Sequence, residues 1–346
     1  MLGISIYTNQ GITVEKNKEY LQKASQAGFK TVFYSGHYFE KDHNDTDLKE
    51  LIKYARKLGL YTILDISKPY FSYDLVKNYA PDALRLDFGF STSEIINLID
   101  NLQCDIQLNG SDNQLGDLSE IIEARGTKRL AISYNFYPKP YTGMDISEFI
   151  FRTKILQKYD VPIFVFLATL EYPRGPLFQG LPTIEKFRQV PPYVQLQWYR
   201  HFGVENCIIS DTMINDSDLK FLVEINNSPE LTIRLDYNNL PEQITALLKN
   251  KVYHIRNDAN SQVLRFVESR GLHNNNANIN TWNNHQLVVP RYSLLIDNYL
   301  YQRYNGEIYL TKTKLLLNEK TNLIINLKKE GVLIDLLEPS KALKFI

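Results

Sequence analysis

The chain has 346 residues, of which 44% are hydrophobic, and its 39 Lys and Arg residues balance 39 Asp and Glu residues. This length exceeds that of a typical single domain, so we expect one large and one small unit. Balanced charge provides no field that would attract nucleic acid or an anionic membrane, and no run of eighteen apolar residues is present. We therefore expect a small-molecule partner, with no nucleic-acid or membrane partner.

The N-terminal segment, MLGISIYTNQG, lacks the basic and apolar regions of a secretory leader, which predicts an unprocessed cytoplasmic protein. Cys104 and Cys207 each begin an apolar run, where a free thiol usually behaves as a small buried hydrophobe. His37 and His43 lie six residues apart and the other four histidines are scattered. The sequence therefore predicts no disulfide and no metal site, and it implies no cofactor.

Short β-rich runs alternate with amphipathic stretches through the first two thirds of the chain. The predicted strands span 2–7, 31–34, 61–66, 83–88, 105–108, 130–134, 163–166 and 207–210, with helical patterns such as 15–27, 47–58 and 146–159 between them. Gly28 and Gly59 each follow a helical stretch and precede a strand, as a glycine at a helix C-terminus does. Eight β/α units in about 225 residues favour an α/β fold of the (β/α)8 TIM-barrel type over an open doubly wound sheet.

The pattern changes after Pro229. Strand-like runs at 231–235, 287–289, 294–296, 307–310 and 322–327 are separated by turn residues. We therefore predict a barrel domain over residues 1–229 and a small, mainly antiparallel β domain over residues 230–346. The Asn-rich tract HNNNANINTWNNH contains Ile279 and Trp282, which favours a long surface loop within the second domain over a linker.

Residues just after the strands of a TIM barrel face the mouth where active sites lie. The polar residues at these positions are Thr8, Asn9, Ser35, His37, Glu40, Asp65, Ser67, Lys68, Asp87, Asn109, Ser111, Asn135, Tyr137, Tyr141, Glu171, Arg174, Asp211 and Thr212. Glycoside cleavage needs a proton donor and a second group, and paired carboxylates supply both. Asp65, Asp87 and Asp211 are the catalytic candidates. A structural role is equally consistent, since Arg85 shares a strand face with Asp87 and an ion pair would satisfy both.

Two segments near the predicted mouth contain candidate binding groups. In LEYPRGPLFQGLPTIEKFR, Arg174 could present its guanidinium to a phosphate or carboxylate while Gly175 lets the backbone approach; the alternative is a solvated loop arginine. In YNFYPKPYTG, Tyr137 and Tyr141 suit either sugar stacking or packing. Glu185 follows Thr183 as the first turn of a helix would, so capping is favoured over a substrate role.

Particular motifs resemble those of a known family. These are LGISIY, DIS, LRLDFG, NFYPKPYTG and RGPLFQGLPTIEKFR in the first part, and IRNDANSQVLRFVESRG and IDNYLYQRYNGEI in the second. Together and in this order they resemble the 6-phospho-N-acetylmuramidase family of bacterial cell-wall recycling enzymes, which have a cyclophilin-like C-terminal domain. The resemblance covers nearly the whole chain.

The resemblance implies hydrolysis of the β-1,4 bond of N-acetylmuramic acid 6-phosphate–N-acetylglucosamine during peptidoglycan recycling. It assigns to the strand-end set Asp65, Asp87, Asn109, Asn135, Tyr137, Tyr141, Arg174 and Glu185, and to the second-domain motif Asn298, Tyr299, Arg303 and Tyr304. On this hypothesis Arg174 and nearby backbone N–H groups bind the phosphate and lactyl carboxylate, Asp65 and Asp87 supply acid and base or nucleophile, and Arg303 reaches the site. Gln179 precedes Gly180 where we expect glutamate in the family, so an acid at that position is not the proton donor.

Two other interpretations stay open at this stage. A sugar-phosphate aldolase or isomerase would use a lysine such as Lys68 or Lys139, although both precede proline in hydrated loops. A non-catalytic binding protein would use its small β domain to engage a partner. A cyclophilin-like shape does not itself predict prolyl isomerase activity. The sequence is compatible with a monomer or a homo-oligomer.

Overall fold

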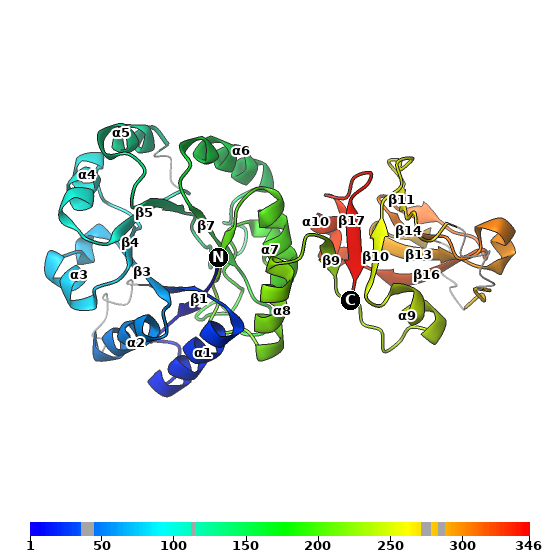
Figure 1. Ribbon diagram of the computed structural model, residues 1–346, viewed down its shortest axis with the longest axis horizontal. Coiled ribbons are helices and arrows are strands. Elements are labelled where there is room, and N and C mark those ends of the chain that lie inside the picture. The colour runs from blue at the N-terminus through cyan, green and yellow to red at the C-terminus, as the bar shows by residue number, and fades with distance from the viewer. Residues whose placement is uncertain (36–44, 112–114, 271–277, 283–287) are drawn as a thin grey trace. The chain divides into compact units, whose positions relative to one another are not determined.

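The computed structural model describes residues 1–35, 45–111, 115–270, 278–282 and 288–346. These residues form two compact units, Met1–Asn226 and Asn227–Ile346. The first unit runs from blue to green in Figure 1 and the second from yellow-green to red. The units are described separately below.

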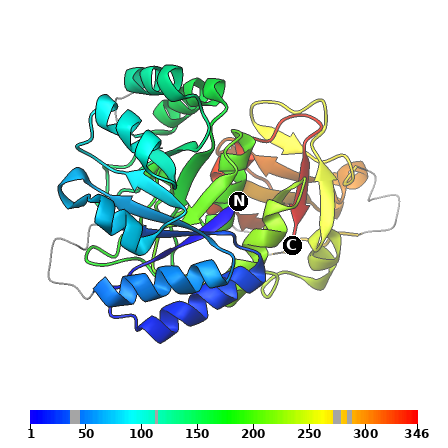
Figure 2. The ribbon, with the colours of Figure 1, turned by 60° about the vertical axis from the view of Figure 1, so that its left-hand side comes forward.

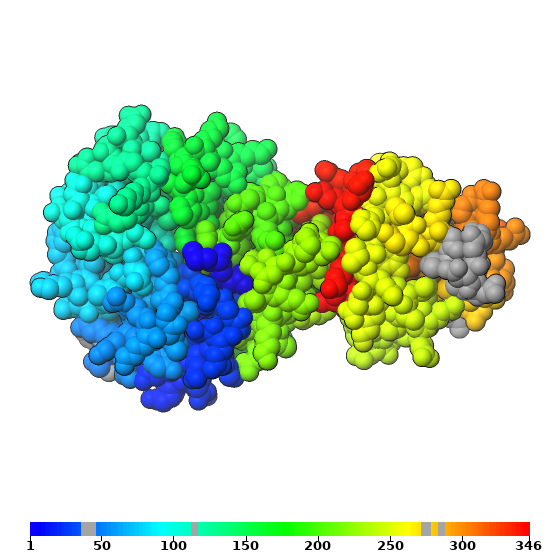
Figure 3. Space-filling view, viewed as in Figure 1, coloured from blue at the N-terminus to red at the C-terminus, as the bar shows by residue number. Residues whose placement is uncertain are grey.

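The first unit is a closed barrel of eight parallel strands in sequence order. The strands are β1(Leu2–Ile6), β2(Thr31–Ser35), β3(Tyr61–Ile66), β4(Ala83–Leu86), β5(Asp105–Asn109), β6(Leu130–Ser133), β7(Ile163–Leu167) and β8(Asn206–Ile209). Pairing of β1 with β8 closes the barrel. In the space-filling view, side chains fill the barrel on the face that carries the N-terminus, so the barrel is a packed core and not a pore (Figure 3). The predicted TIM barrel is confirmed.

Helices surround the barrel. They are α1(Val14–Ala27), α2(Asp45–Lys57), α3(Tyr73–Tyr79), α4(Thr92–Asn101), α5(Leu115–Arg125), α6(Ile146–Leu156), α7(Pro192–His201) and α8(Asp216–Asn226), with short 3-10 turns η2(Lys68–Tyr70), η3(Gln157–Tyr159) and η4(Glu185–Phe187). In the turned view the blue helices α1 and α2 run along the outside of the strands (Figure 2). The order of elements therefore repeats the β/α unit that the sequence pattern predicts.

Local sequence signals fix several helix ends. The Thr13 hydroxyl accepts a hydrogen bond from the backbone N–H of Lys16 at the start of α1. Gly28 ends the same helix with φ +111°, a conformation that costs glycine little because it has no Cβ. Ser91 and Glu94 form a reciprocal capping box at the start of α4.

Strand alternation decides which side chains enter the barrel. A buried apolar layer consists of Phe33, Ile63, Ala83, Ala131, Phe164, Phe166 and Ile208. Positions two residues further along a strand share the same face. Asp65 therefore lies above Ile63, and Arg85 lies above Ala83 beside Asp65 in the strand register. The apolar layer thus supports a polar layer at the C-terminal end of the strands.

The second unit consists mainly of antiparallel sheets. The order in the larger sheet is β11(Val263–Arg265), β14(Ile308–Thr311), β13(Ser293–Asp297) and β16(Thr321–Asn326), and β12(Val288–Val289) pairs with β15(Leu315–Leu316). A third sheet has the order β10(Lys251–His254), β17(Ala342–Phe345) and β9(Leu231–Ile233), in which β17 and β9 are parallel. The remaining elements are α9(Glu242–Leu248), η6(Tyr299–Tyr304), η7(Lys328–Glu330) and α10(Gly331–Ile334). The predicted mainly antiparallel character is confirmed.

Candidate active site

Arg85 is the centre of the polar layer at the barrel mouth. Its Nη1 lies 2.5 Å from Oδ1 of Asp65 and 3.1 Å from Oδ1 of Asp87, and its Nη2 donates to Oδ1 of Asn135. Exposure of the side chain is 3% for Arg85, 2% for Asp65 and 17% for Asp87. Two of the three predicted catalytic carboxylates therefore share one buried guanidinium, and Asp87 is the more accessible of the two.

Asparagine side chains extend this network across β5 and β6. Asn109 Nδ2 donates to the backbone oxygen of Asp87 at 3.3 Å, and Asn109 Oδ1 accepts from the backbone N–H of Ser111 at 2.9 Å. The Ser111 hydroxyl in turn accepts from the backbone N–H of Asn135 at 2.7 Å. The predicted residues Asp65, Asp87, Asn109 and Asn135 thus belong to one connected group.

Arg174 lies against aromatic rings. Its guanidinium carbon is 4.8 Å from the ring centroid of Tyr7 and 5.3 Å from that of Phe136, both within the range of a cation–π interaction. The adjacent Gly175 donates its backbone N–H to Oε1 of Gln10 at 2.9 Å. A Cβ at Gly175 would lie 3.0 Å from that oxygen, so this close approach favours glycine.

Asp211, the third predicted catalytic residue, occupies a different environment. It is fully buried, and its carboxylate accepts backbone N–H groups of Thr169 at 2.8 Å, Arg174 at 2.9 Å and Leu181 at 3.3 Å. Burial raises the pKa of Asp211 to about 6, while the three backbone hydrogen bonds oppose that shift. Both carboxylate oxygens are directed at the loop between β7 and α7.

Glu185 joins two loops of the mouth and does not cap a helix. No α-helix begins there, since η4 is a single 3-10 turn without a side-chain cap and α7 starts at Pro192. The Glu185 carboxylate instead accepts the backbone N–H groups of Tyr141 and Gly143 and two donors from Arg188. The Arg188 guanidinium is the main reason that the pKa of Glu185 falls to about 2. The capping expectation for Glu185 was wrong, because only a single 3-10 turn forms here and the carboxylate is used by Tyr141, Gly143 and Arg188.

The two predicted tyrosines differ in exposure. Tyr141 is 94% exposed and has φ +67°, whereas Tyr137 is partly buried and donates its backbone N–H to Pro182 at 3.0 Å. An exposed aromatic ring on a loop whose backbone is held by Glu185 suits contact with a ligand. His37 and Glu40, two further strand-end positions, lie outside the described residues.

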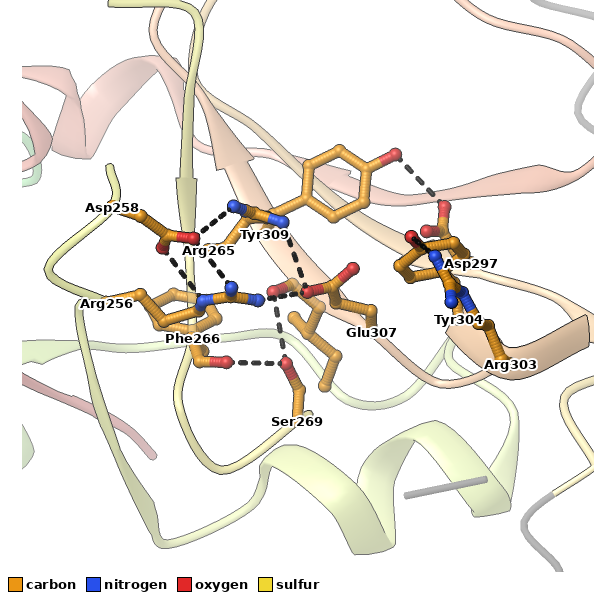
Figure 4. Close-up of polar contacts among 11 residues, drawn as sticks. Arg256, Asp258, Arg265, Phe266, Ser269, Asp297, Arg303, Tyr304, Glu307 and Tyr309 are labelled. Carbon is orange, nitrogen blue, oxygen red and sulfur yellow. Dashed lines mark hydrogen bonds and ion pairs between the residues drawn. The ribbon is translucent and has the colours of Figure 1, made fainter. Parts of the chain in front are cut away.

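Arg303 belongs to η6 of the second unit. Its guanidinium stacks on Tyr304 at 4.8 Å from the ring centroid and donates to the hydroxyl of the same residue at 2.6 Å. Figure 4 shows it apart from a separate charged group in which Arg256 and Arg265 alternate with Asp258 and Glu307. Arg256 and Glu307 in that group are largely buried, with 13% and 9% side-chain exposure, and they form an ion pair at 2.7 Å.

The sequence interpretation missed three residues that organise the mouth. Arg85 was considered only as a possible structural partner of Asp87, and neither Arg188 nor Gln10 was singled out. The sequence did contain a signal for Arg85, because it lies two residues before Asp87 on β4 and therefore shares the inner face of that strand. Gln10 and Arg188 hold segments distant in sequence, and no local pattern points to such contacts.

Three further observations concern metal binding, a barrel-end lysine and membrane spanning. Among the residues that the structure describes, no group of three or more His, Cys, Asp or Glu residues could hold a metal ion. The Lys68 ammonium forms an ion pair with Glu94 at 2.7 Å, and its side chain is 47% exposed. In that part of the chain, no helix is long and apolar enough to cross a membrane.

Comparison with known proteins gives a consistent family. The family model described as 6-phospho-N-acetylmuramidase, N-terminal, matches residues 2–224, and its C-terminal counterpart matches residues 229–346. No curated protein sequence matches the chain. An uncharacterized protein from B. cereus is 23% identical, with a TM-score of 0.77 over 100% of this chain and 99% of its own. A conserved protein from Enterococcus faecalis is 24% identical, with a TM-score of 0.76 over 100% and 96%. These two crystal structures support the fold, and the family models show that the chain belongs to the 6-phospho-N-acetylmuramidase family.

Proposed function

We propose that this protein is a glycoside hydrolase that cleaves the β-1,4 bond of N-acetylmuramic acid 6-phosphate–N-acetylglucosamine. The products are N-acetylmuramic acid 6-phosphate and N-acetylglucosamine, released in the cytoplasm during peptidoglycan recycling. The observation that carries this proposal is the Asp65–Arg85–Asp87 group at the barrel mouth of a chain matched by the family over both parts.

Asp87 is the carboxylate that we assign to contact with the glycosidic bond. Its side chain is 17% exposed, whereas that of Asp65 is 2% exposed. Their Oδ1 atoms lie 2.5 and 3.1 Å from the same nitrogen of Arg85, so they are at most 5.6 Å apart. That upper limit lies below the separation of roughly 6.5–9.5 Å in inverting enzymes and is compatible with the separation of about 5–5.5 Å in retaining glycosidases. It therefore favours retention of the anomeric configuration.

Substrate binding is assigned to groups around this pair. The Arg174 guanidinium binds the phosphate or the lactyl carboxylate, because a guanidinium offers several N–H donors to an anion. The backbone N–H groups of Arg174 and Gly175 are already donated to Asp211 and Gln10, so Gly175 contributes only its close approach to the neighbouring chain. Asn135 uses Oδ1 to accept from Arg85, which directs its amide NH2 away from that contact and makes it available to a sugar hydroxyl or acetamido oxygen. Asn109, Tyr137 and Tyr141 complete the proposed sugar contacts.

The decisive experiment uses the phosphorylated disaccharide and its unphosphorylated counterpart as matched substrates. The purified chain is incubated with each, and N-acetylglucosamine release is followed by mass spectrometry. Selective cleavage of the phosphorylated compound is the expected result. Absence of cleavage of both would reject the hydrolase proposal, and borohydride trapping of a lysine adduct in the same samples would support the aldolase alternative instead.

A further inference from the structure

The segment just after β8 binds the first part of the loop between β7 and α7, from Thr169 to Leu181. Asp211 accepts three backbone N–H groups from this loop, as described above. Ser210 donates its hydroxyl to the backbone oxygens of Leu167 at 2.9 Å and Leu181 at 2.6 Å. Thr212 donates both its backbone N–H and its hydroxyl to the backbone oxygen of Tyr172, at 3.2 and 2.8 Å. Three consecutive residues therefore hold this loop, in addition to the contacts that Gln10 makes with Gly175 and Arg188 makes with Gln179 and Gly180.

The hydrogen bonds of Asp211 argue against a direct role in proton transfer. A general acid or base needs an oxygen within hydrogen-bonding distance of the substrate. Oδ1 of Asp211 is used by Arg174, Oδ2 is used by Thr169 and Leu181, and the residue has no exposed surface. A substrate atom has no route to either oxygen without displacing the loop.

The same contacts fix the position of Arg174. The backbone N–H of Arg174 binds Asp211, and the guanidinium of Arg174 stacks on Tyr7. Tyr7 itself donates its hydroxyl to the backbone oxygen of Ser210 at 2.5 Å. Residues at the end of β8 thus hold both parts of Arg174. Asp211 binds its backbone N–H, and Ser210 binds the hydroxyl of Tyr7, on whose ring its guanidinium stacks. A guanidinium held in this way loses less conformational freedom when it binds an anion.

We propose that Asp211 is a positioning residue: it holds the loop of residues 168–181 so that Arg174 can bind the anionic group of the substrate. This inference rests on the proposed function for the identity of that anion, while the loop-holding role depends only on the contacts above. Asp211 then governs affinity for the anionic substrate and not the rate of bond cleavage.

Protonation of Asp211 has two opposing effects on the loop: it removes a buried charge, and it removes one hydrogen-bond acceptor. A neutral carboxylic acid has one oxygen that carries a hydrogen, so it accepts fewer N–H groups than a carboxylate. The charged or titratable groups that face Asp211 are Arg174 from the loop and the buried Tyr20 from α1. Burial raises the pKa of Asp211 from 3.8 to about 6, so removal of the buried charge outweighs the lost acceptor, and the loop is held more firmly as pH falls through 6 than above it.

Hydrogen exchange tests the loop-holding role without any substrate. Amide exchange of peptides containing Thr169, Arg174 and Leu181 is measured by mass spectrometry in the wild type and in Asp211→Asn. Asparagine keeps the shape but offers an NH2 group where the carboxylate accepts N–H, so exchange at these amides is expected to rise at least about tenfold. Asp82→Asn is the matched control, since Asp82 accepts the Thr62 backbone N–H at 2.9 Å at the opposite end of the barrel. It should accelerate exchange at Thr62 and leave the loop unchanged.

Kinetics with the phosphorylated disaccharide test the functional consequence. We expect Asp211→Asn to raise KM about tenfold or more with kcat changed less than about threefold. A hundredfold loss of kcat with KM unchanged would overturn the proposal, as would unchanged loop exchange. If no hydrolysis occurs even in the wild type, the proposed function fails while the exchange result still decides the role of Asp211. Should the variant not fold, the wild type alone is decisive: loop exchange, relative to Thr62 in the same sample, should decrease as pH falls from 7 to 5, and an unchanged or increased ratio would overturn the loop-holding role.

Discussion

Arg85 Nη1 lies 2.5 Å from Oδ1 of Asp65, and neither side chain is more than 3% exposed. Charges buried in this way are costly unless each is paired, because water no longer solvates them. Arg85 also contacts Asp87 and Asn135. It therefore compensates the negative charge of Asp65 and orients Asp87, the carboxylate that we assign to catalysis. Stability and activity are therefore coupled at this residue.

Replacing Arg85 by Met should destabilise the first unit by about 3–5 kcal/mol, since it removes the guanidinium that pairs with the buried Asp65 carboxylate. Urea unfolding followed through Trp198, the tryptophan of the first unit, in a Trp282→Phe background measures this change. Arg125→Met is the matched control, because Arg125 pairs with Asp100 at 2.6 Å but both side chains are about 40% exposed, and less than about 1 kcal/mol should be lost. Equal losses in the two variants would show that Arg85 is not needed to compensate Asp65.

Asp87→Asn should remove most of the glycosidase activity while preserving the fold. Loss of a catalytic carboxylate lowers kcat by about 10²–10⁴-fold, and the partly exposed Asp87 can be neutralised without leaving an enclosed charge. Cleavage of the phosphorylated disaccharide and urea unfolding should be measured on the same preparation. Asp74→Asn, at an exposed position of α3, serves as the control with unchanged activity. Near-normal kcat in Asp87→Asn would exclude Asp87 from the chemical step.

Glu185→Gln should destabilise the first unit near neutral pH and have less effect in acid. The pKa of Glu185 is lowered to about 2, chiefly by Arg188, so its contribution is present above the ordinary glutamate pKa of 4.5 and is lost as pH falls toward 2. On the order of 2 kcal/mol should be lost at pH 7, after allowance for the 23% exposure of the side chain. Urea unfolding at pH 7 and pH 3 measures the difference.

Glu94→Gln is the control for this experiment. The pKa of Glu94 is also lowered to about 2, mainly by Lys68, but Glu94 lies in solvent and its ion pair is screened. Its substitution should change stability much less than that of Glu185. A pH-independent effect of Glu185→Gln would show that shape, and not charge, holds the two loops together.

The barrel could be predicted because its signals are local. Alternating β-rich and amphipathic runs gave eight strands close to their observed bounds, and Gly28 and Gly59 adopt the expected left-handed conformation, with φ +111° and +72°. The second unit was harder, since β10, β11, β15 and β17 have two to four residues each and show no strong pattern. The parallel pairing of β17 with β9 joins residues more than a hundred positions apart, which no local signal encodes.

The candidate site was predictable as a set of positions but not as a set of partners. The sequence predicted Asp65, Asp87 and Asp211 equally as catalytic candidates, because all three lie at the C-terminal ends of buried strands. The contacts separate them: the first two face one guanidinium, while the third faces backbone amides. Whether an aspartate meets a cation, a loop or a substrate depends on residues brought from other strands, and the sequence alone does not show these.

The pKa of Asp297 in the second unit is raised, whereas that of Glu185 is lowered, so the two residues predict opposite dependences of stability on pH. Its Oδ1 accepts the hydroxyl of Thr321 at 2.8 Å and that of Tyr309 at 3.1 Å (Figure 4 shows the latter). Burial is the main cause that raises its pKa to about 7, with nearby Glu307 adding to the shift. A carboxyl with a raised pKa contributes most to stability below its ordinary pKa of 3.8, and that contribution is lost as pH rises through 7.

Asp297→Asn should therefore stabilise the second unit in alkaline conditions, because asparagine keeps the acceptor oxygen and removes the buried charge. Its advantage over the wild type should grow by on the order of 2 kcal/mol between pH 5 and pH 8. Unfolding followed through Trp282 in a Trp198→Phe background reports on this unit alone. Asp335→Asn is the control, since Asp335 is ion-paired with Arg291 at 2.5 Å and its loss should lower stability at pH 8. A variant at position 297 less stable than the wild type at pH 8 would mean that the ionised carboxylate is favoured there, contrary to the burial argument.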